Sequence, residues 1–259
     1  MKIKELLIER IDVSWITPWI SRSVNAASFA DDDVEWYSAF FKNLNQDSEL
    51  QQWKEQIKLP LKIVSRIIDN PSNTKSMIGA SHYITDDDEH EIEVTVNASR
   101  APDDDAARKK FIDQLTSIMV HELNHAHQRE QQISSTGSVD LAYEIKTDLF
   151  KKQPPAPANE KEKYYLYLLD HMEQDAWLAQ IATEIHQALG DDSLANLNEI
   201  FQKVIKDQYL TISGKILDLK SLRALYLALD HYNGYLKQRV DRHWARVKKN
   251  VYDYLRQYQ

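Results

Sequence analysis

The spacing of apolar residues changes near residue 100, and this change constrains the fold more than any other feature of the chain. In Glu91–Asn97 every second residue is Ile or Val, the pattern of a strand with one buried face. From Pro102 onward, apolar residues recur every three or four positions, which indicates a helix with one apolar stripe. Pro102 and Asp103–Asp105 suit the start of that helix, because its first turn tolerates proline and attracts negative charge. The sequence therefore predicts a strand followed closely by a long helix.

Two more strands are predicted before this one. Leu61–Ile68 is rich in β-branched residues and is followed by the turn-forming residues Asp69–Ser72. Met77–Ile84 is the other candidate, and the acidic turn Asp86–Glu89 would join it to Glu91–Asn97 as a hairpin. We therefore expect a small antiparallel sheet ahead of the long helix.

The N-terminal part of the chain is predicted to be helical. Only 5 glycines occur in 259 residues, which favours long helices over many tight turns. Residues 1–60 form an N-terminal helical region, with breaks near Pro18 and at Asp31–Asp33. A short helix is expected over Ser48–Ile57, ending before Pro60.

The C-terminal part is also predicted to be helical. Residues 131–160 contain Ser, Thr, Gly and several Pro, which indicates a long exposed connection. The first helix is expected over Glu160–Ala188 and stops at Gly190. Two later helices are expected over Leu194–Tyr209 and Leu219–Tyr258, and the last is bent at Asn233 and Gly234. The fold class is thus α+β. The domains are predicted as 1–60 and 61–259, with one continuous domain over 1–259 as the alternative.

Composition argues against several classes of partner and site. The formal net charge is -8, and binding to nucleic acid or to an anionic membrane surface would need a basic face instead. There are 0 cysteines, so a metal would have to be held by His, Asp or Glu. The first residues carry acids and no long apolar run, and no stretch is apolar enough to span a bilayer. We therefore expect a cytoplasmic protein. Secretion by a route that needs no signal peptide is the alternative.

One motif on the long helix carries chemistry. His121-Glu122-Leu123-Asn124-His125 has the form H-E-x-x-H. Two His one turn apart project from the same face of a helix, so both imidazoles can reach one ion. Glu122 is offset around the helix, where its carboxylate can take a proton from a water rather than bind the metal. The motif predicts a Zn²⁺ site with His121 and His125 as ligands and Glu122 as general base. An exposed helix with solvated His and Glu is the alternative.

From Leu61 to about His186 the chain resembles the zincin metallopeptidases, in which a short sheet precedes an H-E-x-x-H helix. The resemblance implies that one edge strand of the sheet lies beside the active site and pairs with extended substrate. Met77–Ile84 matches that edge strand, with Glu91–Asn97 inside it. The domain over 61–259 would accordingly be a zincin-like metallopeptidase domain.

The resemblance also implies a third metal ligand. The metzincin branch would have Gly at position 128 and His at 131, but this chain has Gln128 and Gln131. The gluzincin-like branch takes a Glu from a downstream helix, followed three residues later by a small residue, and Glu173 and Ala176 fit this pattern. Trp177 departs from it, since some members have an acid there, and the segment between His125 and Glu173 is longer than in the shortest members.

Several roles stay open at the level of sequence. His171 is the rival of Glu173 as third ligand, and His127 suits a surface position or a place behind the ligands. Asp170 and Asp175 are both candidates for a carboxylate that holds a ligand ring. The candidates for stabilising an oxyanion are Tyr143, Tyr164, Tyr167, His231 and Tyr232.

The function that the resemblance implies is hydrolysis of peptide bonds by a zinc-dependent metallopeptidase. Its partner would be a peptide or protein substrate, with no nucleic acid or membrane, and the oligomeric state is left open. Two alternatives remain: a zinc hydrolase of another amide such as a cell-wall peptide, and a non-catalytic structural or interaction protein on a zincin fold. The presence of Glu122 disfavours the second, because a structural zinc site needs no general base.

Overall fold

The computed structural model describes residues 12–28, 32–55, 57, 59–68, 78–97, 101–136 and 149–259, without the side chains of Asn97, Ser135, Thr136 and His171. It divides into two compact units, residues 1–145 and 146–259. The fold class is α+β as expected, with a small sheet before a long helix and a mostly helical C-terminal part. The division into domains at residue 60 stays a prediction.

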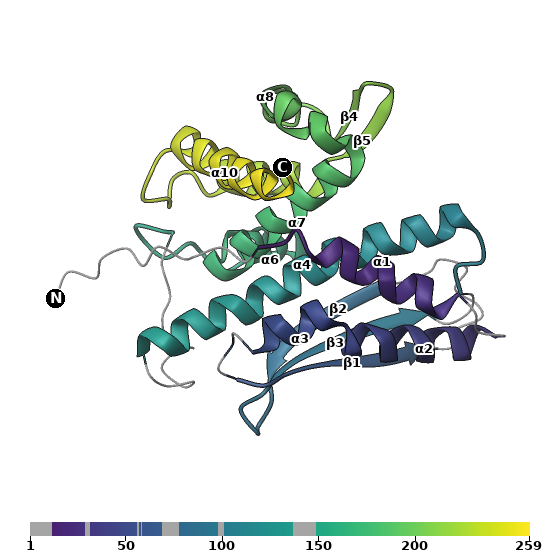
Figure 1. Cartoon of the computed structure of the whole chain (residues 1–259). Coiled ribbons are helices and arrows are strands. Elements are labelled where there is room, and N and C mark those ends of the chain that lie inside the picture. Colours follow the sequence, from purple (N-terminus) through teal and green to yellow (C-terminus); the bar gives the residue numbers. More distant parts are fainter. Residues whose placement is uncertain are drawn as a thin grey trace. The chain divides into compact units, whose positions relative to one another are not determined.

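The first unit contains a sheet of three strands: β1 (Leu61–Ile68), β2 (Ile78–Ile84) and β3 (His90–Asn97). Their order is β1-β3-β2, so β2 lies at an edge and β3 in the centre, as the family resemblance implied (Figure 1). The predicted hairpin of β2 and β3 is confirmed, and Asp88 takes a positive φ of 58° in its turn. Met77 and the turn predicted over Asp69–Ser72 lie outside the described residues.

The expectation of a purely antiparallel sheet was wrong, because β1 pairs with β3 in parallel and the sheet is mixed. Alternation along a strand predicts which face is buried, but it carries no information about the order of the strands. β3 has the longest buried face, since His90, Ile92, Val94 and Val96 are all buried. It therefore takes the central position, where both of its edges are paired, and β1 adds to the edge opposite β2.

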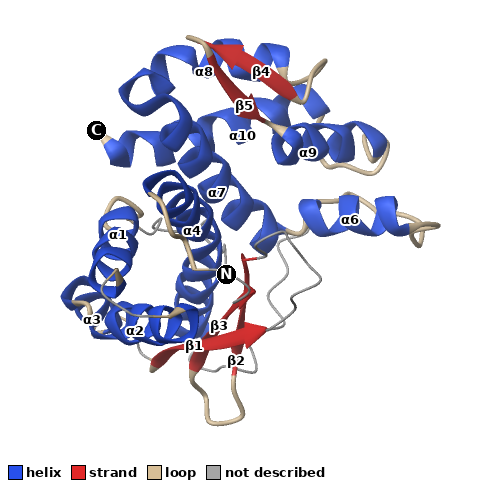
Figure 2. Ribbon diagram, turned by 90° about the vertical axis from the view of Figure 1, so that its right-hand side faces the viewer, coloured by secondary structure: helices blue, strands red, loops and turns tan. Residues whose placement is uncertain are grey.

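The two faces of this sheet differ in character. The register sets Ile63 of β1 and His82 of β2 beside Ile92 of β3, so these side chains share the buried face. Helix α4 (Asp105–Thr136) packs against β2 and β3, which Figure 2 shows in red beside it. The opposite face carries ion pairs that are exposed to solvent, such as Arg66 with Glu93.

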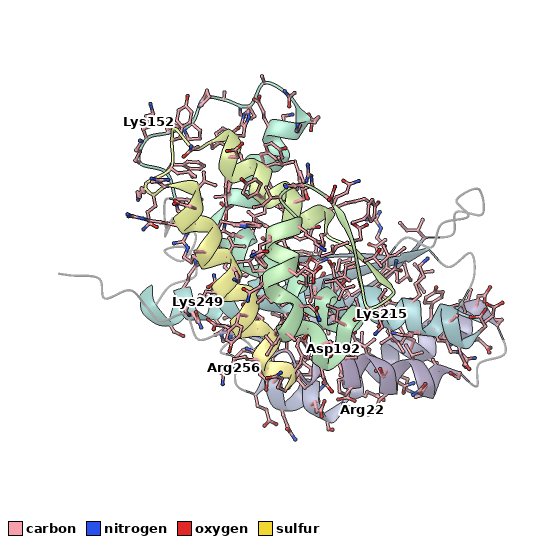
Figure 3. The ribbon with its side chains drawn as sticks, turned by 90° about the horizontal axis from the view of Figure 1, so that it is seen from above. Arg22, Lys152, Asp192, Lys215, Lys249 and Arg256 are labelled. Atoms are coloured by element: carbon pink, nitrogen blue, oxygen red, sulfur yellow. The ribbon has the colours of Figure 1, made fainter. Side chains whose placement is uncertain are left out.

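Three shorter helices lie in the described part of the first unit: α1 (Ile16–Ala27), α2 (Asp33–Gln46) and α3 (Ser48–Lys54). The break expected near Pro18 was wrong, because Pro18 lies in the first turn of α1, where a missing N–H loses no hydrogen bond. Asp32 caps α2 by accepting from the amide of Glu35. Asp47 caps α3 and also binds the guanidinium of Arg22, which Figure 3 labels on α1.

Helix α4 is the longest element of the first unit. Asp104 caps it by accepting from the amide of Ala107 at 2.6 Å, so the helix begins just after the predicted Pro102. It continues to Thr136, into the segment that was expected to be a connection. Phe111 packs against Trp36 and Phe40 of α2, with ring centroids 5.4 Å away from each. This aromatic contact fixes α4 to the neighbouring helices at the end that precedes the H-E-x-x-H residues.

The helix predicted over Glu160–Ala188 is two helices, α6 (Glu160–Leu169) and α7 (His171–Leu189), in the second unit. Asp170 separates them because its backbone is extended, with ψ 131°, and its side chain accepts from the amide of Met172. An Asp favours such a cap over a helix interior, and the apolar spacing alone did not reveal it. Gly190 ends α7 with a positive φ of 60°, as predicted.

The remainder of the second unit departs further from the prediction. Helix α8 (Ser193–Lys203) is followed by a hairpin of β4 (Tyr209–Ile212) and β5 (Lys215–Asp218), where a longer helix was expected. Ser213 and Gly214 both have positive φ, which a two-residue hairpin turn requires. The predicted bend at Asn233 and Gly234 is a full break between two helices, α9 (Lys220–His231) and α10 (Val240–Leu255).

The second unit has its own core. α7 packs against α10, and α6 packs against α9. Tyr258, in the turn that follows α10, bonds through its hydroxyl to Thr183 of α7 at 2.8 Å and stacks on His186 at 4.2 Å between ring centroids. None of the helices in the described part of the chain is both long and apolar enough to cross a membrane.

Candidate metal centre

Helix α4 brings the two His of the motif together. His121 and His125 lie one turn apart on the same face, and their Nε2 atoms are 3.1 Å from each other. Two nitrogens that bind a tetrahedral Zn²⁺ at about 2.0–2.1 Å lie about 3.3 Å apart. The pair is therefore already spaced as ligands of one ion, which supports the sequence interpretation over that of a merely solvated helix.

The orientation of the His125 ring suits metal binding. Its Nδ1 lies 3.3 Å from Oε1 of Gln128, which is buried. Because a carbonyl oxygen only accepts, this contact places the ring proton on Nδ1, so Nε2 carries the lone pair with which the ring could bind a cation. Gln128 occupies the position at which a metzincin would have Gly, and here it contacts the ring of His125.

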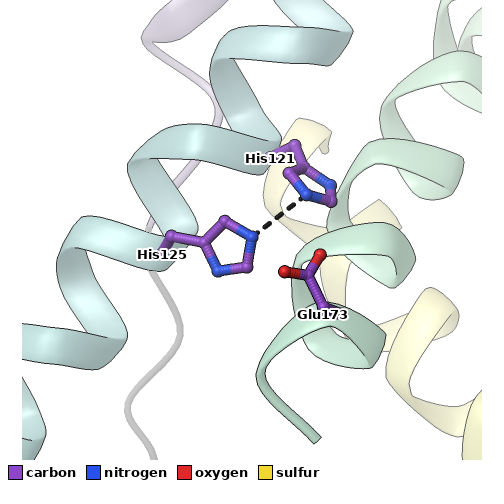
Figure 4. A group of neighbouring side chains, drawn as sticks. All are labelled: His121, His125 and Glu173. Atoms are coloured by element: carbon purple, nitrogen blue, oxygen red, sulfur yellow. Dashed lines mark hydrogen bonds between the residues drawn. The ribbon is translucent and has the colours of Figure 1, made fainter. Parts of the chain in front are cut away.

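Three side chains form a group that could hold a metal ion: His121, His125 and Glu173. Each offers one ligand atom, and these atoms lie within 4.8 Å of one another. Figure 4 draws the three side chains and marks the contact between the two rings. His121 is buried, and His125 and Glu173 are partly buried. Two imidazoles and a carboxylate are a donor set that zinc accepts.

Glu122 lies next to His121 on α4 and is 8% exposed. Its side chain is offset from that of His121 by about 100° around an ideal helix. Burial of a carboxylate costs free energy unless partners stabilise it. The burial of Glu122 therefore distinguishes it from an ordinary glutamate on a helix surface, which is exposed to solvent. Its role as general base stays a prediction.

The residues left open by the sequence fall into different places. The side chain of His171, the rival third ligand, lies outside the described residues. Asp170 caps α7, and Asp175 lies 3.2 Å from the hydroxyl of Tyr254, which donates to it. Each of these two carboxylates thus has a structural partner within the second unit. His127 is partly exposed and contacts Gln131 at 2.9 Å, as expected for a position away from the ligands.

Four of the five oxyanion candidates lie in the second unit. Tyr143 lies outside the described residues, and Tyr164 and Tyr167 are exposed on α6. His231 lies 3.7 Å from Glu162. Tyr232 is buried, and among the described residues its hydroxyl has no hydrogen-bond partner. None of the five is favoured by these positions.

Sequence reasoning missed three polar residues beside the motif: His82 on β2, His90 on β3 and Glu130 on α4. His82 Nε2 lies 2.8 Å from His90 Nδ1, and His90 Nε2 lies 3.1 Å from Glu130 Oε1. The His82 ring stacks on that of His125, with centroids 6.4 Å apart and planes at 20°. Burial, followed by the nearby His90 and His125, lowers the pKa of His82 to about 2, so its ring is neutral.

The signal for two of these residues was present in the sequence. His90 continues the alternation of Ile92, Val94 and Val96, so it belongs to the buried face of the strand. Glu130 falls in the apolar stripe of α4 between Ala126 and Ile133, both buried. A polar residue that interrupts a buried pattern needs a partner, and here each provides one for the other.

No family model matches the chain, and searches of curated proteins and of solved structures also gave no match. The fold and the candidate metal centre are therefore the observations on which a function can be based.

Replacing Gln128 with Ala should lower the affinity for Zn²⁺ by about tenfold or more, because the His125 ring loses the acceptor that sets its proton and orientation. Gln128→Glu should keep the affinity, since a carboxylate also accepts from Nδ1–H. The measurement is a competitive Zn²⁺ titration of folded protein.

Gln131→Ala is the matched control, because it removes a similar contact between a glutamine and a histidine, that with His127 on the same helix. Equal losses in Gln128→Ala and Gln131→Ala would show that the effect is a general weakening of α4 and not the orientation of His125.

Proposed function

We propose that this protein is a zinc-dependent metallopeptidase whose metal is held by His121, His125 and Glu173. The observation that carries the proposal is the group of three ligand atoms within 4.8 Å of one another, of which two come from an H-E-x-x-H motif. The spacing of the two Nε2 atoms, 3.1 Å, supports binding to a single ion.

The donor set favours zinc. With 0 cysteines in the chain, the ligands are limited to nitrogen and oxygen, and two imidazoles with one carboxylate are a common set for catalytic zinc. Ca²⁺ and Mg²⁺ prefer oxygen ligands and are disfavoured by two His. Three protein ligands leave a fourth position for a water or a substrate oxygen, as catalytic sites require.

A bound Zn²⁺ would supply a Lewis acid that polarises the substrate carbonyl and lowers the pKa of water to about 7. Within the chain, the carboxylate of Glu122 accepts the proton of the attacking water. Glu122 then donates this proton to the nitrogen of the leaving amine when the C–N bond breaks. The burial of Glu122 supports this role, because little bulk water reaches the carboxylate to compete for that proton.

Strand β2 supports a peptide as the substrate. It is an edge strand of the sheet, it runs beside α4, and its outer edge has no strand partner among the described residues. An extended peptide can add to such an edge through backbone hydrogen bonds. A peptide or protein substrate, with no nucleic acid or membrane as partner, is accordingly part of the proposal.

Replacing Glu122 with Gln should reduce peptide hydrolysis by several orders of magnitude, because the amide keeps the shape of the side chain but cannot accept the proton. Zinc binding should change little, since Glu122 is not a ligand. The measurement is turnover of a peptide library by zinc-loaded protein. A variant as active as the parent on a verified substrate would remove Glu122 from the mechanism.

Replacing Glu173 with Ala should weaken zinc binding markedly, because two imidazoles leave the ion short of a protein ligand. His171→Ala is the control, since the two residues point about 200° apart around an ideal helix and should not both face the ion. Competitive zinc titration compares both variants with the parent. Unchanged affinity in Glu173→Ala together with a large loss in His171→Ala would give the third position to His171.

A further inference from the structure

The three polar residues that the sequence analysis missed form a continuous chain of contacts inside the first unit. Glu130 Oε1 accepts from the backbone amide of Leu59 at 2.8 Å and lies 3.1 Å from Nε2 of His90. His90 in turn contacts His82, whose ring stacks on His125. His90 is 0% exposed and Glu130 is 6% exposed, so water does not compete for these contacts.

The chemistry of the contacts gives each hydrogen bond a direction. A carboxylate only accepts, so Nε2 of His90 carries the proton and donates it to Glu130. When the His90 ring carries this one proton, its Nδ1 is an acceptor, and Nε2–H of His82 donates to it. The donors therefore point from His82 to His90 and from His90 to Glu130. These two hydrogen bonds hold each ring in one tautomer.

This chain of contacts fixes a ring beside a proposed ligand. His82 stands on edge strand β2, whose position would otherwise be less restrained than that of a central strand. The bond to His90 ties His82 to the central strand, and the bond to Glu130 ties both to α4. His125 is thus held by Gln128 at its Nδ1 and by the neutral ring of His82 against its face.

We propose that Glu130, His90 and His82 are positioning residues, which hold the ring of His125 in the orientation that presents Nε2 to the metal. They do not touch the ion themselves; they act through His125. The inference rests on the proposed metal centre and adds to it a set of residues that links the sheet to the ligands.

The test compares Zn²⁺ affinity in Glu130→Leu, Glu130→Gln and the parent. Leu removes the acceptor for His90, and we expect the affinity to fall by about tenfold or more. Gln keeps an oxygen acceptor of nearly the same shape, so it should retain most of the affinity. His82→Leu removes the ring that contacts His125 and should show a loss similar to that of Glu130→Leu, which gives a second variant if Glu130→Leu does not fold.

Glu91→Leu is the matched control. Glu91 lies on β3, as His90 does, and bonds to Tyr83 of β2, but on the exposed face of the sheet. It should therefore bind Zn²⁺ as the parent does. An affinity within about twofold of the parent in both folded variants, Glu130→Leu and His82→Leu, would overturn the inference.

A second readout separates this inference from the proposed function. In metal-free protein with ¹⁵N-labelled histidine, NMR should show His82 and His90 both protonated at Nε2, and proximity between the His82 and His125 rings. A parent that binds no Zn²⁺ would contradict the proposed function, while these ring signals would still decide whether the positioning chain exists. Rings with mixed tautomers and no proximity would contradict the chain even if Zn²⁺ binds.

Discussion

The packing of α4 on one face of the three-stranded sheet is the interaction on which the first unit depends. Its buried residues, such as Leu115, Met119 and Leu123, recur at helical spacing, while the sheet offers Ile92 and Val94 at strand spacing. Burying apolar surface of this kind stabilises a fold by about 25 cal/mol per Å². The same packing sets the rotation of α4, and hence the face on which His121 and His125 lie together.

Polar residues are buried within this apolar contact, and they need compensation. An unpaired polar group in such a place costs about 1–3 kcal/mol, and an unpaired charge costs more. Glu130 meets this need through the amide of Leu59 and the ring of His90. Glu130 thus connects α4 both to the sheet and to the segment that precedes β1. Such connections restrict the motion of side chains that must hold a ligand in a fixed geometry.

Much of the first unit could be predicted from sequence because its elements follow regular periods. The three strands and the start of α4 came from alternation, helical spacing and the acids that cap the helix. The order of the strands could not be predicted, because the parallel pairing of β1 with β3 depends on which strand has the longest buried face. In the second unit, the cap at Asp170 and the turn at Ser213 and Gly214 are single-residue features that apolar spacing averages out.

The part of the candidate metal centre that lies on one helix could be predicted from sequence, and the part that depends on strand pairing could not. The H-E-x-x-H spacing identified His121 and His125 because helix geometry alone brings positions one turn apart together. His82 and His90 come from two strands, and only the pairing of β2 with β3 brings their rings to 2.8 Å between nitrogens. Such contacts depend on register and cannot be derived from one strand's sequence.

The central claim is that the two His of α4 bind zinc as a pair. The most direct measurement is the zinc content of protein that has been stripped with a chelator, reconstituted with Zn²⁺ and dialysed. It should be compared with the His121→Ala/His125→Ala double variant. We expect about one zinc per chain in the parent and none in the double variant. A parent with no zinc above background, or a double variant that retains as much as the parent, would contradict it.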